Sequence, residues 1–78
     1  MPTLLRVGPY RFFVYATDRA GAPFVHVEQG GQLATFGLEP PRLQRNAGFH
    51  RRDVHRLERI VDDHAAALAE GWHAYFDD

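Results

Sequence analysis

The stretch from Arg51 to Phe76 is the feature that most constrains how this chain can fold. It contains no proline, and its apolar residues recur every three or four positions, at Val54, Leu57, Ile60, Val61, Ala65, Leu68, Trp72, Tyr75 and Phe76. This spacing predicts one amphipathic helix with a single apolar face. A helix of 26 residues is about 39 Å long. We therefore expect it to cover a small sheet and to extend beyond that sheet.

The length of 78 residues predicts a single domain over residues 1–78. A domain of this size buries only about 60% of the surface of its unfolded chain. The chain has no cysteine, so neither a disulfide nor a thiolate metal site adds stability. Association with another chain is one remaining source of stability. The apolar and aromatic fractions, 45% and 13%, exclude a disordered chain. No apolar run reaches the ~20 residues of a membrane span, and the N-terminus lacks a signal-peptide pattern, so we expect a cytoplasmic protein without membrane contact.

Four segments before the helix have the composition of β-strands: residues 3–7, 10–16, 24–29 and 32–38. Residues 10–16 are apolar on both faces except at Arg11, which is typical of a strand with neighbours on both sides. Turns rich in glycine and proline separate the segments. We expect an α+β fold in which residues 3–38 form a small, four-stranded, mostly antiparallel sheet. The element order is β-β-β-β-α, with the long C-terminal helix packed on one face.

The dipeptide Gly30-Gly31 predicts a two-residue turn between the segments 24–29 and 32–38. If Gln29 pairs with Gln32, alternate residues of this hairpin face opposite sides. The side toward the helix then carries Val25, Val27, Ala34 and Phe36. The other side, facing solvent or an interface, carries Phe24, His26, Glu28 and Thr35.

Residues 39–50 are predicted to be a connector between sheet and helix. Two consecutive prolines end the sheet, because proline has no N–H to donate to a ladder. His50 is the expected N-cap of the helix, and Phe49 and Val54 flank it as a hydrophobic staple. Gly71 costs about 1 kcal/mol relative to alanine inside a helix, so a bend or fraying is expected there.

Positive and negative charges are separated along the chain, although the net charge is only −1. Residues 60–78 carry five acids and no arginine, while residues 42–59 have a local charge of +4. The arginines of this basic part are Arg42, Arg45, Arg51, Arg52, Arg56 and Arg59. Arginines at the helix start, and Asp77 and Asp78 after its end, oppose the helix dipole. This order indicates an external ligand for the arginines: phosphates, or an acidic partner surface such as that of a second copy. A solvated helix face is the alternative.

His26 and Glu28 are the candidate catalytic residues. They lie two residues apart on one predicted strand, so their side chains point to the same side. A histidine that is oriented by a carboxylate can act as a general base, and Thr35 on the neighbouring strand could hydrogen-bond to it. The alternative is a polar, solvent-facing strand surface. Zinc needs three or four ligands and this surface offers two, so no metal and no other cofactor are expected.

The helix also supplies candidate interface residues. His64 adjoins the apolar stripe, which indicates a half-buried or interfacial position. The ending Trp72-x-x-Tyr75-Phe76 is apolar on more than one side. We expect it to fasten the helix to the sheet, and an aromatic end exposed to a partner is the alternative.

Short motifs follow one another along the chain as Y-R-F-F-V-Y, P-F-V-H-V-E, F-x-L-E-P, N-x-G-F-x-R-R and E-x-W-x-x-Y-F. With the opening M-P-T-L-L-R they resemble, over essentially the whole chain, a family of short bacterial proteins, the domain of unknown function numbered 4160. The resemblance implies no activity and no residue roles. Members are described beside another small gene of unknown function, an arrangement similar to toxin–antitoxin pairs. Where members have P-H-V-H-V, this chain has Phe24 in place of the first histidine, which weakens any proposal of a paired-histidine site.

From these observations we expect a small non-catalytic binding protein that acts as a homo-oligomer or with a small protein partner encoded nearby. In the second case it would be one half of a toxin–antitoxin-like pair. One alternative is a metal-independent ribonuclease-like toxin with His26 as the base, which requires phosphate contacts from Arg42, Arg51 or Arg52 on the same surface. Another is salt-sensitive nucleic-acid binding through Arg52, Arg56 and Arg59, although the slightly acidic net charge disfavours a strong binder.

Overall fold

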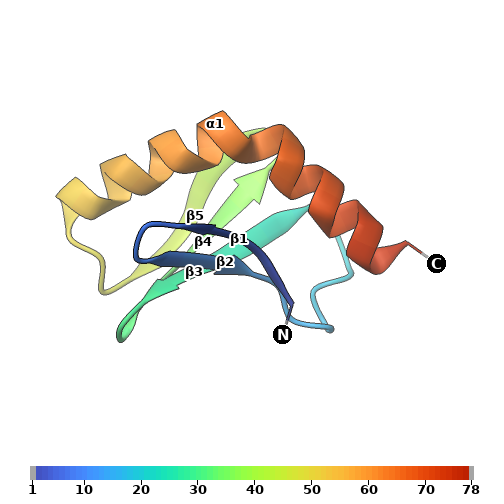
Figure 1. Cartoon of the computed structure of the whole chain (residues 1–78), viewed down its shortest axis with the longest axis horizontal. Helices are drawn as coiled ribbons and strands as arrows, with labels where there is room; N and C mark the ends of the chain where they lie inside the picture. Colours follow the sequence, from blue (N-terminus) through green and yellow to red (C-terminus); the bar gives the residue numbers. More distant parts are fainter. Residues whose placement is uncertain (1, 78) are drawn as a thin grey trace.

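The fold is an open five-stranded sheet with one long helix across it (Figure 1). The computed structural model describes residues 2–77. The elements are β1 (Thr3–Val7), β2 (Tyr10–Phe13), β3 (Phe24–Gln29), β4 (Gln32–Leu38), β5 (Pro41–Ala47) and α1 (Arg51–Phe76). Each strand pairs antiparallel with the next along the chain, in the spatial order β1-β2-β3-β4-β5. The predicted α+β class is confirmed. Within residues 2–77, no helix is both long and apolar enough to span a membrane.

Glycine opens two of the tight turns. Gly8 begins the turn between β1 and β2, and Gly30 begins the turn between β3 and β4; their φ angles are 55° and 59°. A positive φ at the first turn position suits a two-residue primed turn, whose twist matches that of the paired strands. The predicted register is confirmed, because Gln29 pairs with Gln32 along a regular β3–β4 ladder.

The segment after β4 is a strand and not a connector. Glu39 and Pro40, joined by a cis peptide bond, form a two-residue turn, and Leu38 pairs with Pro41 at the start of β5. Proline fits the first position of an edge strand, where its missing N–H removes no necessary ladder bond. The predicted sheet of four strands is therefore short by one strand, and most of the predicted connector over residues 39–50 is that fifth strand. The reason is that the two prolines turn the chain without ending the sheet.

Strand β2 ends at Phe13, earlier than the predicted limit of residue 16. The reason is a turn held by Asp18. Its backbone N–H donates to the Tyr15 carbonyl at 3.0 Å, and its carboxylate accepts from the Tyr15 N–H at 2.8 Å. The strand lies between β1 and β3, as its apolar composition predicted.

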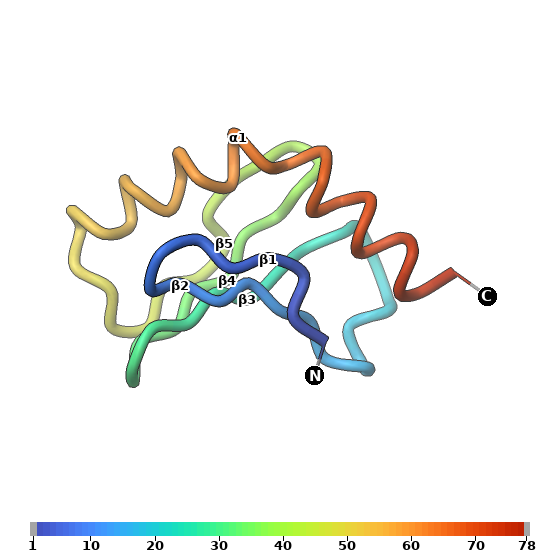
Figure 2. Tube along the Cα trace, viewed as in Figure 1, coloured from blue at the N-terminus to red at the C-terminus, as the bar shows by residue number. Residues whose placement is uncertain are grey.

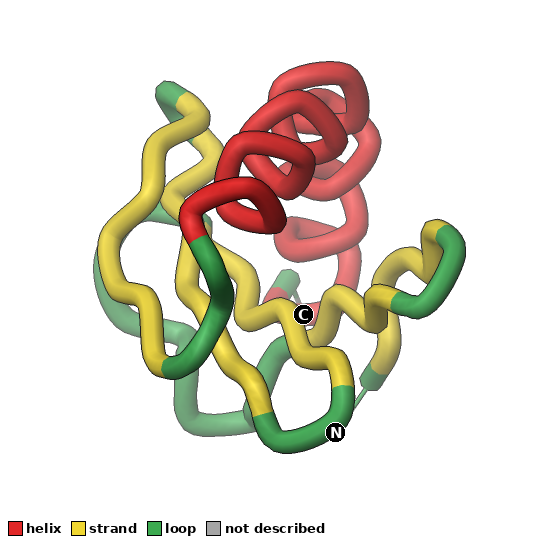
Figure 3. Tube along the Cα trace, turned by 90° about the vertical axis from the view of Figure 1, so that its left-hand side faces the viewer, coloured by secondary structure: helices red, strands yellow, loops and turns green. Residues whose placement is uncertain are grey.

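The sheet is curved, and α1 lies in its concave side (Figure 3). Alternate strand residues face α1 and are at most 1% exposed: Phe12, Val25, Val27, Ala34 and Phe36. Leu57, Val61 and Leu68 of α1 pack against them and are equally buried. The convex side carries no helix, and we call it the outer face. Strand pairing places on it Arg6, Arg11, Phe13, Phe24, His26, Glu28, Leu33, Thr35, Arg42 and Arg45.

The start of α1 is fixed by side chains on both sides of His50. The His50 ring accepts a hydrogen bond from the Arg52 N–H at 3.1 Å, and Phe49 and Val54 are 5% and 8% exposed. The predicted N-cap is thus confirmed, and both residues of the predicted hydrophobic staple are buried. Asn46 at the end of β5 adds a contact that the sequence did not suggest. Its side chain donates to the Phe49 carbonyl at 2.9 Å and accepts from the Phe49 N–H at 3.0 Å, so it joins sheet and helix.

The C-terminal part of α1 is also anchored. The helix continues through Gly71 to Phe76, so the predicted fraying at Gly71 is wrong; α1 does bend, but near its middle (Figure 2). Leu4 of β1 packs next to Gly71, and the Arg19 guanidinium donates to the Phe76 carbonyl at 2.9 Å. The loop after β2 therefore supports the part of the helix that extends beyond the strands. Asp78, which entered the charge prediction, lies outside the described residues.

Candidate functional site

His26 lies at the centre of a row of residues that crosses the outer face. It pairs with Phe13 on one neighbouring strand and with Thr35 on the other, and Thr35 pairs with Arg45 on β5. Directly paired residues of an antiparallel sheet point to the same side. The row therefore places an aromatic ring, an imidazole, a hydroxyl and a guanidinium side by side.

Both ring nitrogens of His26 have polar neighbours. Nε2 lies 2.8 Å from the Asp18 carboxylate, and Nδ1 lies 3.4 Å from the Thr35 hydroxyl. The side chains of His26 and Asp18 are only 14% and 13% exposed. Because Asp18 also accepts from the Tyr15 N–H, the histidine fastens the loop after β2 to the sheet.

Glu28 does not contact the imidazole, and the orienting position predicted for it is held by Asp18. Glu28 accepts from Arg11 Nε at 2.8 Å. The same guanidinium donates to the Thr3 hydroxyl at 3.2 Å and stacks on Phe13, with Cζ 4.3 Å from the ring centre. Sequence reasoning missed Asp18 because it precedes His26 by eight residues within a segment that was read only as a turn.

Aromatic rings surround His26 on the outer face. The ring centres of Phe13, Tyr15 and Phe24 lie 5.3, 4.9 and 5.4 Å from that of the imidazole. Phe13 is buried beneath its neighbours, Phe24 is half-buried, and Tyr15 is 38% exposed. Within residues 2–77 no group of three or more His, Cys, Asp or Glu side chains could hold a metal ion.

The candidate arginines fall into two groups on opposite sides of the sheet. Arg42 and Arg45 belong to β5 and lie on the outer face with His26. A bulge in β5 places Gln44 between paired positions. Its side-chain amide nitrogen lies 2.9 Å from the point where a Cβ on Gly37 would be. The remaining four arginines belong to α1, on the concave side: Arg51, Arg52, Arg56 and Arg59. The structure thus brings Arg42 to the surface of His26, but not Arg51 or Arg52.

The solvent side of α1 carries what we call the charged stripe: Arg52, Arg56, Arg59, Asp63 and Glu70. All five are exposed, and their spacing places them on one side of a helix with 3.6 residues per turn. Arg56 lies 4.0 Å from Asp53, and its side chain is 60% exposed. Such an exposed pair contributes little to stability, so Arg56 is available to an external partner.

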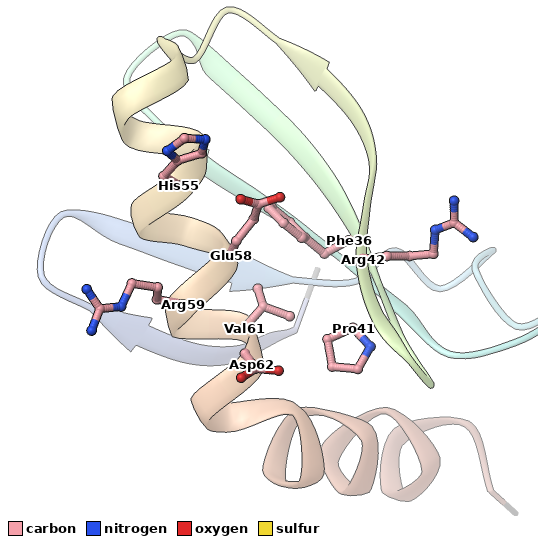
Figure 4. Close-up of a pocket in the computed structure, with 8 residues that line it drawn as sticks. All are labelled: Phe36, Pro41, Arg42, His55, Glu58, Arg59, Val61 and Asp62. Carbon is pink, nitrogen blue, oxygen red and sulfur yellow. The ribbon is translucent and has the colours of Figure 1, made fainter.

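An open groove of about 520 Å³ separates α1 from the β4–β5 hairpin (Figure 4). Phe36 and Pro41 line its sheet side, and His55, Glu58 and Asp62 line its helix side. Arg42 and Arg59 also line the groove, from β5 and α1, but their guanidinium groups point away from it (Figure 4). The groove therefore does not join the arginines of the two groups into one site.

Three of the four candidate interface residues on α1 are at least partly covered. Trp72 and Phe76 are 6% and 9% exposed and belong to the core, and His64 is half-buried. Tyr75 is 43% exposed and so is available to a partner. The buried Trp72 Nε1 has no hydrogen-bond partner among the described residues. The aromatic ending thus fastens the helix to the sheet through Trp72 and Phe76.

Comparison with known proteins identifies the family. Residues 10–73 match the family model described as Domain of unknown function (DUF4160), so the chain belongs to this family. The resemblance seen in the motifs is confirmed. No curated protein and no solved structure matches the chain.

Proposed function

We propose that this member of the DUF4160 family is a small non-catalytic binding protein that acts in a complex, with the charged stripe of α1 as the contact surface. The occupant of the stripe is a second copy of the chain, whose helix lies antiparallel to the first. The observation that supports this proposal is the order of charges along the stripe, which is complementary to the same stripe of a second, antiparallel copy.

The charges of the stripe are arranged symmetrically about Val61. Arg52 and Glu70 lie nine residues before and after it, and Arg59 and Asp63 lie two residues before and after it. When two copies lie antiparallel with their Val61 positions at the same level, Arg59 of each copy faces Asp63 of the other, and Arg52 faces Glu70. Because α1 bends with its solvent side convex (Figure 1), the inner Arg59–Asp63 pairs come closest. The exposed residue opposite Arg56 is then Ala66, whose small side chain allows the helices to approach closely.

The expected association is weak. Exposed ion pairs contribute about 0.2–1 kcal/mol each, so four pairs across the interface supply about 1–4 kcal/mol. A dissociation constant of 1 µM corresponds to about 8 kcal/mol, and one of 1 mM to about 4 kcal/mol. The ion pairs therefore set the orientation and the salt dependence of a complex that forms at high local concentration.

The surroundings of His26 favour binding over catalysis. A general base needs an accessible nitrogen within hydrogen-bond reach of the proton that it removes. The His26 side chain is 14% exposed, and its nitrogens already face Asp18 and Thr35. This arrangement supports a structural role for the histidine and a non-catalytic protein.

Sedimentation velocity over protein concentrations from about 10 µM to 1 mM tests the proposal. We expect the average mass to rise toward that of a dimer at low salt and to return to that of a monomer in ~0.5 M NaCl. Arg52→Glu/Arg59→Glu should prevent association, and adding Asp63→Arg/Glu70→Arg should restore it. The matched control Arg42→Glu/Arg45→Glu changes the outer face only.

A monomer at every concentration would contradict the homo-oligomer. A small partner protein encoded nearby, as in a toxin–antitoxin-like pair, would then be the occupant of the stripe. If the fourfold variant remained monomeric while the wild type dimerised, the antiparallel geometry would be wrong.

A further inference from the structure

The outer face is more basic than the chain as a whole. It carries four arginines, Arg6, Arg11, Arg42 and Arg45. Within residues 2–77, two carboxylates reach this face, and both are engaged: Glu28 binds Arg11, and Asp18 contacts His26. Of the acids of α1, Glu58 and Asp62 line the groove that Arg42 also lines from β5. Among the described residues, positive charges therefore outnumber negative charges on the outer face, by four arginines to two carboxylates.

Aromatic rings interrupt this basic surface. Tyr15 is 38% exposed and packs edge-on against the buried Phe13. Phe24 is half-buried and lies beside His26. Tyr15 also contacts His26, so both rings lie next to the imidazole. A partly exposed ring on a face that also carries arginines provides a surface on which a planar base can stack.

We propose that the outer face binds single-stranded nucleic acid. Arg42 and Arg45 on β5 contact the phosphates, and Tyr15 and Phe24 stack with the bases. Neighbouring strands lie about 4.8 Å apart, and Arg45 is two strands away from His26 in the same row. The two residues are therefore separated by about 10 Å across the sheet. Phosphates on the edge strand and bases over the centre of the sheet thus fit on one face.

Other occupants fit the outer face less well. A second copy would bring two net-basic faces together, because Arg6, Arg42 and Arg45 of each copy have no carboxylate partner on this face among the described residues, which is unfavourable. An acidic protein would use the arginines but would leave the rings without a planar partner. A duplex would meet the arginines with its phosphates, but its bases are already stacked on one another. Single strands are the class that uses both the charges and the rings.

The binding surface differs from that of the proposed oligomer, and the inference holds equally for a monomer.

Fluorescence anisotropy measures binding at 50–200 mM salt. The labelled probes are a mixed-sequence 12-nucleotide RNA, its DNA equivalent and the corresponding duplex. We expect both single strands to bind more tightly than the duplex. Each phosphate contact contributes about 0.7 to the salt slope, so Arg42→Ala/Arg45→Ala should lower the slope by about 1.4.

Matched variants separate the outer face from α1. Tyr15→Ala should weaken binding by roughly 5- to 150-fold, while Tyr15→Phe keeps the stacking ring and should bind as the wild type does. Tyr75→Ala removes the similarly exposed ring of α1, which is 43% exposed in the wild type, and should have no effect. Arg52→Ala/Arg59→Ala is the corresponding charge control. Thermal unfolding of each variant reports whether the fold is intact.

Four results would overturn the proposal. The first is no binding at 50 mM salt with 100 µM protein, and the second is equal affinity for duplex and single strand. The third is an equal loss of affinity for RNA in the α1 variants and the outer-face variants. The fourth is competition by poly-glutamate as effective as that by unlabelled RNA. The last result would assign the surface to acidic proteins. Since the oligomer is measured by mass and this surface by anisotropy, either proposal can fail without the other.

Discussion

Replacing Gly71 by alanine should stabilise this protein. Gly71 lies within α1, five residues before its end, and its φ is not in the positive range. Glycine in a helix interior is less favourable than alanine by about 0.8–1.0 kcal/mol, because it loses more backbone freedom on folding. A Cβ at this position would meet its nearest neighbour, Leu4 Cδ2, at 3.5 Å, which is an ordinary contact distance.

The expected gain is therefore about 1 kcal/mol in the free energy of unfolding. The three Leu4 atoms within 4 Å of the new Cβ add dispersion contacts of about 0.1–0.2 kcal/mol each. For a domain of this size, 1 kcal/mol raises Tm by about 4–8 °C. Thermal unfolding followed by circular dichroism at 222 nm, with urea unfolding as a second measurement, checks this value.

Gly48→Ala is a matched control with the opposite expected sign. There too the added Cβ meets its nearest atom, Gln32 Cγ, at 3.5 Å. The φ of Gly48 is 106°, however, a conformation that costs a residue with a Cβ about 1–3 kcal/mol. With similar space at both sites, backbone conformation decides the sign. A lower Tm for Gly71→Ala, or an unchanged one for Gly48→Ala, would refute this reasoning.

Two further predictions concern the contacts that join loops to the sheet. Asn46→Ala removes both hydrogen bonds to the Phe49 backbone. It should lower the free energy of unfolding, measured with urea, by about 1–3 kcal/mol. A change below ~0.5 kcal/mol would mean that water replaces the amide. Asp18→Ala removes the acceptor shared by the Tyr15 N–H and His26. Amide hydrogen exchange of residues 14–23 should therefore accelerate, while that of α1 should not change. Unchanged protection of the loop would contradict the role assigned to Asp18.

Local patterns with a strict period could be predicted from the sequence. The bounds of α1 follow from its apolar spacing and from the His50 cap, both of which act within one or two turns. The register of β3 and β4 follows from Gly30-Gly31, because a two-residue turn leaves one pairing that buries the apolar side. The division of the hairpin into a buried side and an outer side follows from the same register.

The features that could not be predicted depend on contacts between distant residues or on proline in an unusual place. Strand β5 has four charged or amide side chains among seven residues and a proline at its start, so composition did not distinguish it from a loop. Its strand character comes from pairing with β4. Asp18 was missed for a related reason, since its contact with His26 exists only once the loop after β2 has folded back.

The net charge of −1 is a sum over the whole chain and does not describe the charge of either face. The acids of the charged stripe, Asp63 and Glu70, lie on the solvent side of α1, so the helix and the sheet separate them from the outer face. A packed layer is about 10 Å thick, and the Debye length at physiological ionic strength is about 8 Å. An anion at the outer face is therefore affected mainly by Arg42, Arg45 and their neighbours there. Two surfaces of different character can thus act independently on a chain that is nearly neutral.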